Sequence, residues 1–389
     1  MKTNSISAGL ACHARTIAAT RHLIFRHAWL WTGFLAFATI AFRPQPAQAA
    51  VTEAWVQRYN GSVNASDQAT AVAVDASGNV FVTGSSVGSG GTEDYATIAY
   101  SSAGVPLWTN RYNGPGNGHD TAYAVAVDAS GNVFVTGSSG DSSGNYDYVT
   151  IAYSGAGVPL WTNRFDGPEN SWDQATAVAV DGSGNVFVTG SSRDSSGDYG
   201  YVTIAYSGEG VPLWTNRYNG PANGADLASA VAVDGSGNVV VTGRTDSIQD
   251  ALIGAFWGGD YYTAKYAAAD GATLWEKRFN GPLSLSFPSA SPCLALGPNG
   301  MIAISGSFSG DFATVVYREV PAVSINLVPT GVRLRFSGLS GRTYNIERAS
   351  AVVGPWSTIN TQTAPVSGLL EYLDTTPHSG SGFYRLVQP

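Results

Sequence analysis

The sequence predicts an all-β fold, because a segment rich in strand-forming residues is repeated five times and helical periodicity is absent after the first 50 residues. The segment AVAVDASGNVFVTGSS recurs nearly unchanged, with its aspartate at steps of 53 residues. The aspartates are Asp75, Asp128, Asp181 and Asp234, and the glycines that close the segment are Gly84, Gly137, Gly190, Gly243 and Gly306. A fixed period of this length is typical of folds built from successive similar units.

Each copy divides into four strand-like runs separated by turn residues. In the second copy the runs cover 121–128, 132–139, 147–154 and 159–165, and they are rich in Val, Ile, Thr, Tyr and Phe, which suit a pleated sheet. Asp-Ala-Ser-Gly-Asn separates the first two runs, and there Asp accepts backbone hydrogen bonds while Gly supplies a positive φ. Four antiparallel strands per repeat predict a β-propeller blade, and five copies predict a five-bladed propeller over 50–319.

The two ends of the repeat array predict how the ring closes. If the Ala-Val-Ala-Val-Asp run is the innermost strand, the tryptophan run is the outermost. The array begins with such an outer run at 54–60 and ends at 311–317 without one. The N-terminal strand is therefore expected to complete the fifth blade, which removes two open sheet edges.

The repeat also carries a family resemblance. The pattern ATAVAVD, SGNV and VTG, followed by DY, TIAY and LW, resembles the bacterial β-propeller repeat (SBBP-type) family of secreted and cell-surface proteins, over roughly 52–318. The resemblance implies the architecture and an extracellular location, and it implies no reaction.

The first 49 residues have the features of a signal peptide. Four basic residues precede an apolar run at 28–42, and Ala47-Gln48-Ala49 follows as a small-x-small cleavage site. Cleavage near Ala49 predicts a protein secreted to the periplasm, cell surface or medium, with no segment that inserts into a membrane. Cys12 would leave with this leader, so Cys293 has no partner for an internal disulfide.

Net charge excludes some classes of partner. The whole chain has 20 basic and 28 acidic residues, or −8. Residues 51–319 hold 10 basic and 25 acidic residues, which gives −15. Such a charge repels nucleic acid and anionic membranes, and it is compatible with neutral or cationic partners or with calcium.

One arginine recurs at the same position in every blade, in the series Arg58, Arg111, Arg164, Arg217 and Arg278. An aspartate begins the third strand in four blades, in the series Asp94, Asp147, Asp260 and Asp311. Because the guanidinium fork suits carboxylates, a residue required in every blade is best interpreted as a structural ion pair. The alternative is a ring of charged binding sites.

Two longer loops place acids close together and are the candidates for calcium. They contain Asp141 and Asp147 in one blade, and Asp194 and Asp198 in the next. Carboxylates at this spacing suit calcium, although the same composition is typical of solvated turns. No other cofactor is indicated.

Ligand-binding residues are expected where the blades differ, which is in the loops on one face of the ring. The divergent loops carry His119, Tyr146, Trp172, Tyr199, Trp257 and Phe287. Aromatic rings beside polar groups suit a glycan or a peptide. Trp257 belongs to an insertion in the fourth blade, which alternatively forms a lid over the central channel.

Residues 320–389 change in composition and contain about six short strand-like runs. They predict a small β-sandwich that resembles the fibronectin-like domains of secreted bacterial proteins, which usually act as spacers or attachment points.

The sequence favours a monomeric, non-catalytic binding protein that is secreted or attached to the cell surface, with an extracellular glycan or protein as its partner. A carbohydrate-active enzyme, either a glycosidase or a lyase, is the alternative, and it requires carboxylates near the propeller axis. A third hypothesis is a structural spacer.

Overall fold

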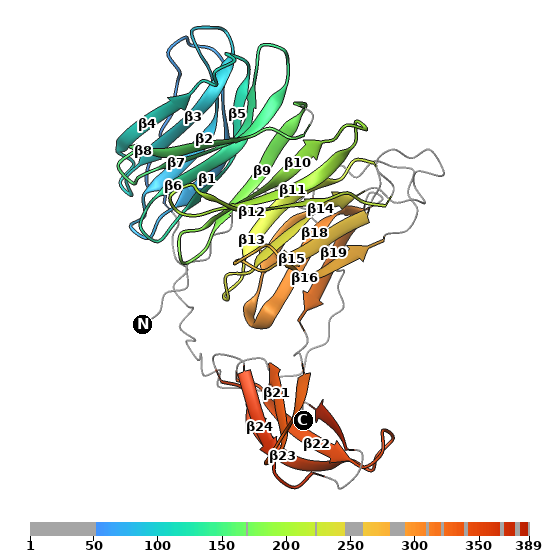
Figure 1. Ribbon diagram of the computed structural model, residues 1–389. Coiled ribbons are helices and arrows are strands. Elements are labelled where there is room, and N and C mark those ends of the chain that lie inside the picture. Colours follow the sequence, from blue (N-terminus) through green and yellow to red (C-terminus); the bar gives the residue numbers. More distant parts are fainter. Residues whose placement is uncertain are drawn as a thin grey trace, which may run out of the picture.

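The computed structural model describes residues 52–168, 170–221, 224–245, 260–280, 292–308, 311–319, 323–337, 341–365, 369–377 and 382–387. It confirms the all-β class and the four-stranded antiparallel repeat (Figure 1). The predicted leader at 1–49, Trp257 and Phe287 lie outside the described residues. Among the residues described, no helix is both long and apolar enough to span a membrane.

Four sheets each contain four consecutive strands in sequential order. Sheet 1 has β1 (Asp67–Val74), β2 (Val80–Val87), β3 (Glu93–Tyr100) and β4 (Pro106–Tyr112). Sheet 2 has β5 (Asp120–Val127), β6 (Val133–Gly140), β7 (Tyr146–Tyr153) and β8 (Pro159–Phe165). Sheet 3 has β9 (Asp173–Val180), β10 (Val186–Arg193), β11 (Tyr199–Tyr206) and β12 (Pro212–Tyr218). Sheet 4 has β13 (Leu227–Val233), β14 (Val239–Thr245), β15 (Asp260–Tyr266) and β16 (Thr273–Phe279).

Consecutive sheets pack face to face through an apolar layer. A tyrosine near the start of each third strand crosses to the next sheet, and the Tyr95 hydroxyl donates to the carbonyl oxygen of Val149 over 3.2 Å. The ring of Tyr95 joins Ala122, Val133 and Val149 in one buried cluster. A side chain at Gly137 would place its Cβ 2.8 Å from the Tyr95 hydroxyl and 2.0 Å from a backbone oxygen, so this position of the repeat requires glycine.

The tryptophan of each outer strand packs on a turn of the next sheet. Trp108 covers Gly157, and its indole Nε1 donates to the carbonyl oxygen of Gly155 over 3.0 Å. Gly157 has φ of 81°, which favours glycine, and a Cβ there would lie 2.6 Å from the indole ring. The contact therefore fixes both the turn and the spacing between sheets.

The predicted fourth strand of the fifth sheet is absent among the described residues. Sheet 5 contains β17 (Cys293–Leu296), β18 (Met301–Phe308) and β19 (Asp311–Arg318), and residues 52–60 form no strand. This N-terminal segment instead packs on sheet 1, where the Trp55 indole donates to the carbonyl oxygen of Ser102 over 3.1 Å. The segment thus makes the face contacts of an outer strand without its edge pairing.

The C-terminal residues form two three-stranded antiparallel sheets with their own core. One contains β20 (Val323–Val328), β21 (Gly331–Ser337) and β24 (Leu369–Asp374), and the other contains β22 (Thr343–Ala349), β23 (Ser357–Thr363) and β25 (Phe383–Val387). Leu334 and Phe336 of the first sheet pack against Tyr344 and Ile346 of the second.

Candidate functional site

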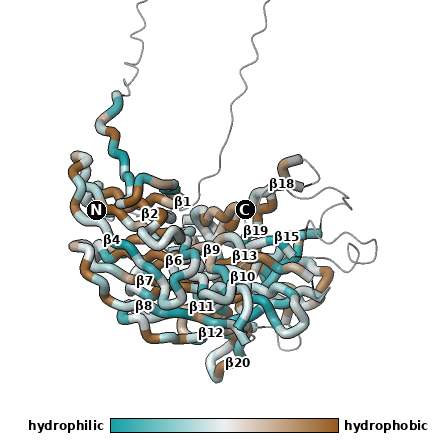
Figure 2. The backbone as a smooth tube through the Cα atoms, turned by 90° about the horizontal axis from the view of Figure 1, so that it is seen from above, coloured by the Kyte–Doolittle hydropathy of each residue, from teal (hydrophilic) through white to brown (hydrophobic). Residues whose placement is uncertain are grey.

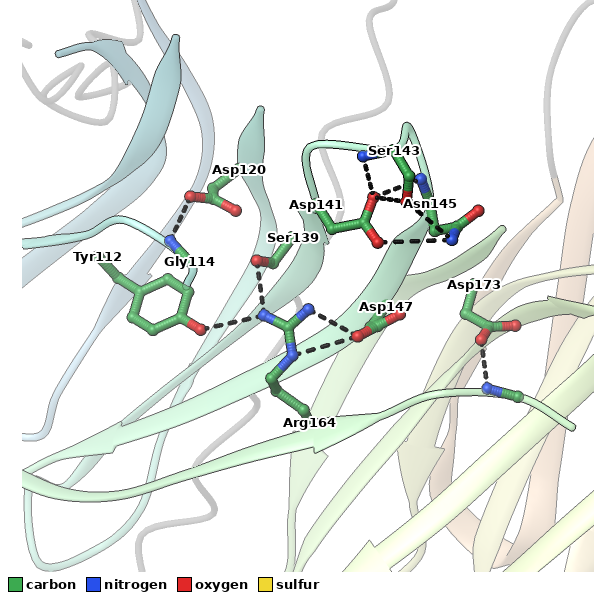
Figure 3. Close-up of polar contacts among 11 residues, drawn as sticks. Tyr112, Gly114, Asp120, Ser139, Asp141, Ser143, Asn145, Asp147, Arg164 and Asp173 are labelled. Carbon is green, nitrogen blue, oxygen red and sulfur yellow. Dashed lines mark hydrogen bonds and ion pairs between the residues drawn. The ribbon is translucent and has the colours of Figure 1, made fainter. Parts of the chain in front are cut away.

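The recurring arginine connects strands within one sheet and also reaches the preceding outer strand. Arg164 donates through Nε and Nη2 to the Asp147 carboxylate over 3.2 and 2.6 Å. Its Nη1 donates to the hydroxyls of Ser139 and Tyr112 (Figure 3). Arg111 makes the same set of contacts with Asp94, Ser86 and Tyr59.

Asp141 and Asp194, two of the calcium candidates, form the caps of their own turns. Oδ1 of Asp141 accepts hydrogen bonds from the backbone N–H and hydroxyl of Ser143 and from the N–H of Asn145 (Figure 3). Oδ1 of Asp194 does the same with Ser196 and with the N–H of Asp198. These bonds lower the pKa of both carboxyl groups, with the serine hydroxyl as the largest cause.

Asp147, the third candidate, belongs to a cluster of acids between sheets 2 and 3. Oxygen atoms of Asp147, Asp166 and Asp173 all lie within 4.8 Å of one another. Asp147 is on β7, Asp166 follows β8 directly, and Asp173 begins β9. Calcium takes six to eight oxygen ligands, so these three carboxylates would form only part of a calcium site.

The surroundings of Asp166 and Asp173 favour the protonated form of both carboxyl groups. Burial raises the pKa of Asp173, although hydrogen bonds from Ser192 and from the Gly167 N–H oppose it. Desolvation raises the pKa of Asp166, and the charge of Asp147 adds to that effect. The Arg164 guanidinium partly offsets the negative charge, since it pairs with Asp147.

An aromatic pair lies at the same junction. Tyr146 and Trp172 are stacked, with ring centroids 5.4 Å apart and planes at 29°, and an isolated parallel bridge joins their backbones. Trp172 is 47% exposed, whereas Tyr146 is half-buried. The pair neighbours the acids in the sequence, since Tyr146 precedes Asp147 and Trp172 precedes Asp173, and successive side chains of a strand point to opposite faces of the sheet.

The other predicted ligand residues lie at neighbouring junctions. His119 holds the repeat position of Trp172, is exposed, and accepts a long 3.5 Å hydrogen bond from the Glu93 N–H through Nδ1. Tyr199 holds the repeat position of Tyr146 and faces the Arg193 guanidinium, 5.7 Å from its ring centroid. The structure therefore brings together Tyr146 and Trp172 of the predicted residues. The backbone of His119 lies close to the Tyr146 ring, since both approach Gly140, while Tyr199 contacts Arg193.

Comparison with known proteins agrees with the repeated sheets. Residues 55–91 match the β-propeller repeat, SBBP. No curated protein matches the chain. Similar solved structures include the GH43_1 enzyme from Xanthomonas citri complexed with xylose, at 13% identity and a TM-score of 0.31 over 63% of this chain and 88% of the other. The same enzyme in a second structure aligns at 14% identity and a TM-score of 0.30, over 55% and 80% of the chains.

A third similar structure is the Mitotic Checkpoint Complex, at 11% identity and a TM-score of 0.26, over 68% of this chain and 82% of the other. At these TM-scores and identities, the alignments support no activity for this propeller repeat protein.

Sequence reasoning missed one residue of the site, Asp166. Four repeats end their outer strand with Asn at this position, as in Asn113 and Asn219, and only the copy between sheets 2 and 3 has Asp. A comparison of the propeller repeats with one another contains that signal. Asp166 adds an exposed negative charge that the other junctions do not have at this repeat position.

Proposed function

We propose that this protein is a non-catalytic glycan-binding protein whose aromatic platform, Tyr146 and Trp172, lies at the junction of sheets 2 and 3. The observation that carries the proposal is the exposed Trp172 ring stacked on Tyr146, at positions next in sequence to Asp173 and Asp147. A sugar ring presents a flat face of C–H groups to such a platform, while its hydroxyl groups donate to nearby carboxylates.

Charge selects the class of glycan. Carboxylate oxygens of three acids lie within 4.8 Å of one another, in Asp147, Asp166 and Asp173. Arg164 pairs with Asp147. With −15 over residues 51–319, the surroundings repel acidic polysaccharides. We therefore expect a neutral polysaccharide, with calcium as an optional bridge between the carboxylates and sugar hydroxyls.

The carboxylate geometry supports binding over glycoside hydrolysis. Asp147 is held in an ion pair with Arg164 at 2.6 Å, which occupies its Oδ2. Asp173 is fully buried, and its Oδ2 accepts from the Gly167 N–H. Asp166 is then the one exposed acid of the three, whereas glycoside hydrolysis generally requires two carboxylates that reach the substrate.

The finer architecture belongs to the same proposal. We take the five sheets to be five blades of one ring, exported as a monomer after cleavage near Ala49. The C-terminal sheets serve as a spacer or attachment domain of the fibronectin-like kind. The repeat match, the predicted leader and the separate C-terminal core support this organisation.

The test is binding of the mature chain to a panel of neutral, acidic and amino polysaccharides and to basic peptides, with calcium and with EDTA. Trp172→Ala and Tyr146→Ala should each weaken capture of a neutral glycan by about five- to thirtyfold, since loss of one aromatic contact costs about 1–2 kcal/mol.

Tyr199→Ala is the matched control. It removes the tyrosine at the equivalent position of the next junction, where Ala225 stands in place of Trp172, and it should leave capture within about twofold of wild type. Capture of basic peptides alone, or equal losses in all three variants, would contradict the glycan platform.

A further inference from the structure

The recurring arginine has three kinds of partner where its set of contacts is complete. Arg164 in sheet 2 donates to an aspartate, a serine hydroxyl and a tyrosine hydroxyl, which belong to Asp147, Ser139 and Tyr112. The aspartate and the serine are in its own sheet, whereas the tyrosine belongs to the outer strand of the preceding sheet. All three nitrogens of the Arg164 guanidinium are therefore used within the repeat.

Arg217 in sheet 3 keeps one of these three partners. Its Nη2 donates to the Ser192 hydroxyl over 3.0 Å. Gly200 stands where the other sheets have the aspartate, and Phe165 stands where the preceding outer strand would supply the tyrosine hydroxyl. Among the residues that the structure describes, Arg217 forms no ion pair and no second hydrogen bond, and its side chain is exposed. Its Nε and Nη1 donors are therefore free to bind a ligand.

Arg217 lies at the same junction as the cluster of acids. Figure 1 and Figure 2 show sheets 2 and 3 side by side. The strand partner of Arg217 is Val202, whose carbonyl oxygen accepts from the Tyr148 hydroxyl of sheet 2 over 3.4 Å. Burial raises the pKa of Tyr148, and the charge of Arg217 opposes that rise. On the other side, Ser192 pairs with Asp173 across β10 and β9, so one residue separates the guanidinium from the cluster.

A third departure from the repeat falls at this junction. At three other junctions a hydroxyl of one innermost strand donates to a carbonyl oxygen of the next. The pairs are Thr70 with Ala122, Thr176 with Ala228 and Ser229 with Pro292. Sheet 2 has Tyr123 at this position, and it makes no such bond among the described residues. Three contacts of the repeat are thus lost between sheets 2 and 3 although the arginine is kept, which indicates a role for its guanidinium beyond construction of the sheets.

The groups at this junction suit the hydroxyl groups of a neutral sugar. A hydroxyl group both donates and accepts hydrogen bonds, so it is satisfied by a carboxylate on one side and a guanidinium on the other. Asp166 and Arg217 are both exposed and can supply these two groups. A ligand carboxylate or sulfate would also suit a guanidinium, but the three clustered acids and the charge of −15 over residues 51–319 repel it.

We propose that Arg217 is a further glycan-binding residue, which donates to neighbouring hydroxyl groups of a neutral sugar while Asp166 accepts from them. The inference rests on the proposed glycan-binding function and extends its site. The aromatic platform is close along the chain, because the Arg193 N–H donates to the Trp172 carbonyl oxygen over 3.2 Å and Ser192 directly precedes Arg193. A polysaccharide that covers the platform can therefore continue to the guanidinium.

Capture of soluble neutral polysaccharides (a β-glucan, a galactomannan and an arabinoxylan) by the mature chain tests this role, with calcium and with EDTA. Arg217→Gln should weaken capture by about tenfold or more, because hydrogen bonds from a charged donor are lost. It should change Tm little, since it removes one hydrogen bond of the fold. Arg111→Gln is the matched control. It removes the ion pair with Asp94 and the bonds to Ser86, so it should lower Tm and leave capture within about twofold of wild type.

Phe165→Tyr is an independent variant that leaves the arginine in place. It restores the hydroxyl of the repeat, which should accept from Arg217 as the Tyr112 hydroxyl accepts from Arg164. The guanidinium then has fewer free donors, so capture should fall while Tm stays the same or rises. Tyr112→Phe makes the reverse change at the preceding junction and should leave capture unchanged.

The outcomes separate this inference from the proposed function. Capture that is lost in Trp172→Ala but kept in Arg217→Gln overturns the role of the arginine and leaves the glycan platform standing. Equal falls of Tm in Arg217→Gln and Arg111→Gln would show a structural arginine and also overturn it. The same holds if Phe165→Tyr raises Tm with undiminished capture. A wild-type chain that captures none of the polysaccharides overturns both proposals.

Discussion

At the scale of single residues, repeated positions and exceptional positions have different roles. Arg111 and Arg164 have the same three kinds of partner in successive sheets, which are an aspartate, a serine hydroxyl and a tyrosine hydroxyl. That regularity indicates construction of the sheets, since each neighbouring interface needs the same contacts. Asp166 breaks the regularity and joins Asp147 and Asp173 in a cluster of acids, so departures from the repeat are the better guide to function.

The buried Asp173 predicts a specific dependence of stability on pH. Burial raises its pKa in the folded state, so the folded state holds the proton to higher pH than the unfolded state. Ionised Asp173 therefore lowers the free energy of unfolding above the folded pKa, and this cost disappears below the unfolded value of 3.8. Asp173→Asn should be more stable than wild type at pH 7, with the difference shrinking toward pH 4.

Urea unfolding in EDTA from pH 4 to 7 measures this difference. Asp141→Asn is the control of opposite sign, because the Ser143 hydroxyl lowers the pKa of Asp141. Its ionised form stabilises the folded state above 3.8, and that stabilisation is lost as the pH falls through the folded pKa. A stabilising effect of both variants at pH 7 would show that general charge reduction, and not burial, governs the result.

At the scale of elements, the N-terminal segment shows that side-chain packing against the face of the next sheet can form without backbone pairing to a strand at a sheet edge. Residues 52–60 form no strand, although Trp55 stacks on Tyr100 with centroids 5.8 Å apart, as Trp108 stacks on Tyr153 at 5.8 Å. The contact of an outer segment with the next sheet depends on residues about 47 positions apart, as for Trp55 with Ser102. Edge pairing requires a partner strand more than 250 residues away along the chain and carries a larger loop-closure cost.

Trp55→Ala should therefore destabilise the protein about as much as Trp108→Ala. Each variant removes an aromatic contact and an indole hydrogen bond of 3.1 or 3.0 Å, which we expect to cost about 2 kcal/mol for a half-buried ring. Unfolding followed by circular dichroism avoids the loss of tryptophan signal. A Trp55→Ala variant as stable as wild type would show that the segment is a loose tail.

At the scale of the whole molecule, Glu319 marks the end of the repeat array. Its carboxylate accepts from the Trp275 indole over 2.8 Å and pairs with Lys265, which is 4% exposed and also pairs with Asp234 at 2.7 Å. The following sheets have a core drawn from their own strands. On this arrangement we propose that the domain boundary lies at 319–320.

Truncation tests that boundary. A chain that ends at Glu319 should unfold at the midpoint of the mature protein, because it keeps the contacts of Lys265 and Trp275. A chain that ends at Arg318 should lose about 1 kcal/mol of unfolding free energy, since it leaves a part-buried indole N–H and the buried Lys265 ammonium each without one partner. Equal midpoints for both truncations would contradict the role of Glu319.

Much of the fold could be predicted from the chain alone. The runs expected in the second repeat at 121–128 and 147–154 correspond to β5 (Asp120–Val127) and β7 (Tyr146–Tyr153). Less of the site could be predicted. Tyr146, Trp172 and Asp147 stood out from the loops, but Asp166 did not, and Asp141 caps its own turn. Which carboxylates meet depends on how adjacent sheets pack, and no single repeat contains that information.

The sequence by itself determined the strands, their order within each sheet and the residues that join one sheet to the next, because these features are local and recur with every repeat. Only the tertiary structure decided that Tyr146 and Trp172 stack on each other, and that Asp147, Asp166 and Asp173 meet between sheets 2 and 3. The physical reason is distance along the chain. A repeat specifies its neighbour, whereas a junction or a ring closure depends on the relative orientation of whole sheets.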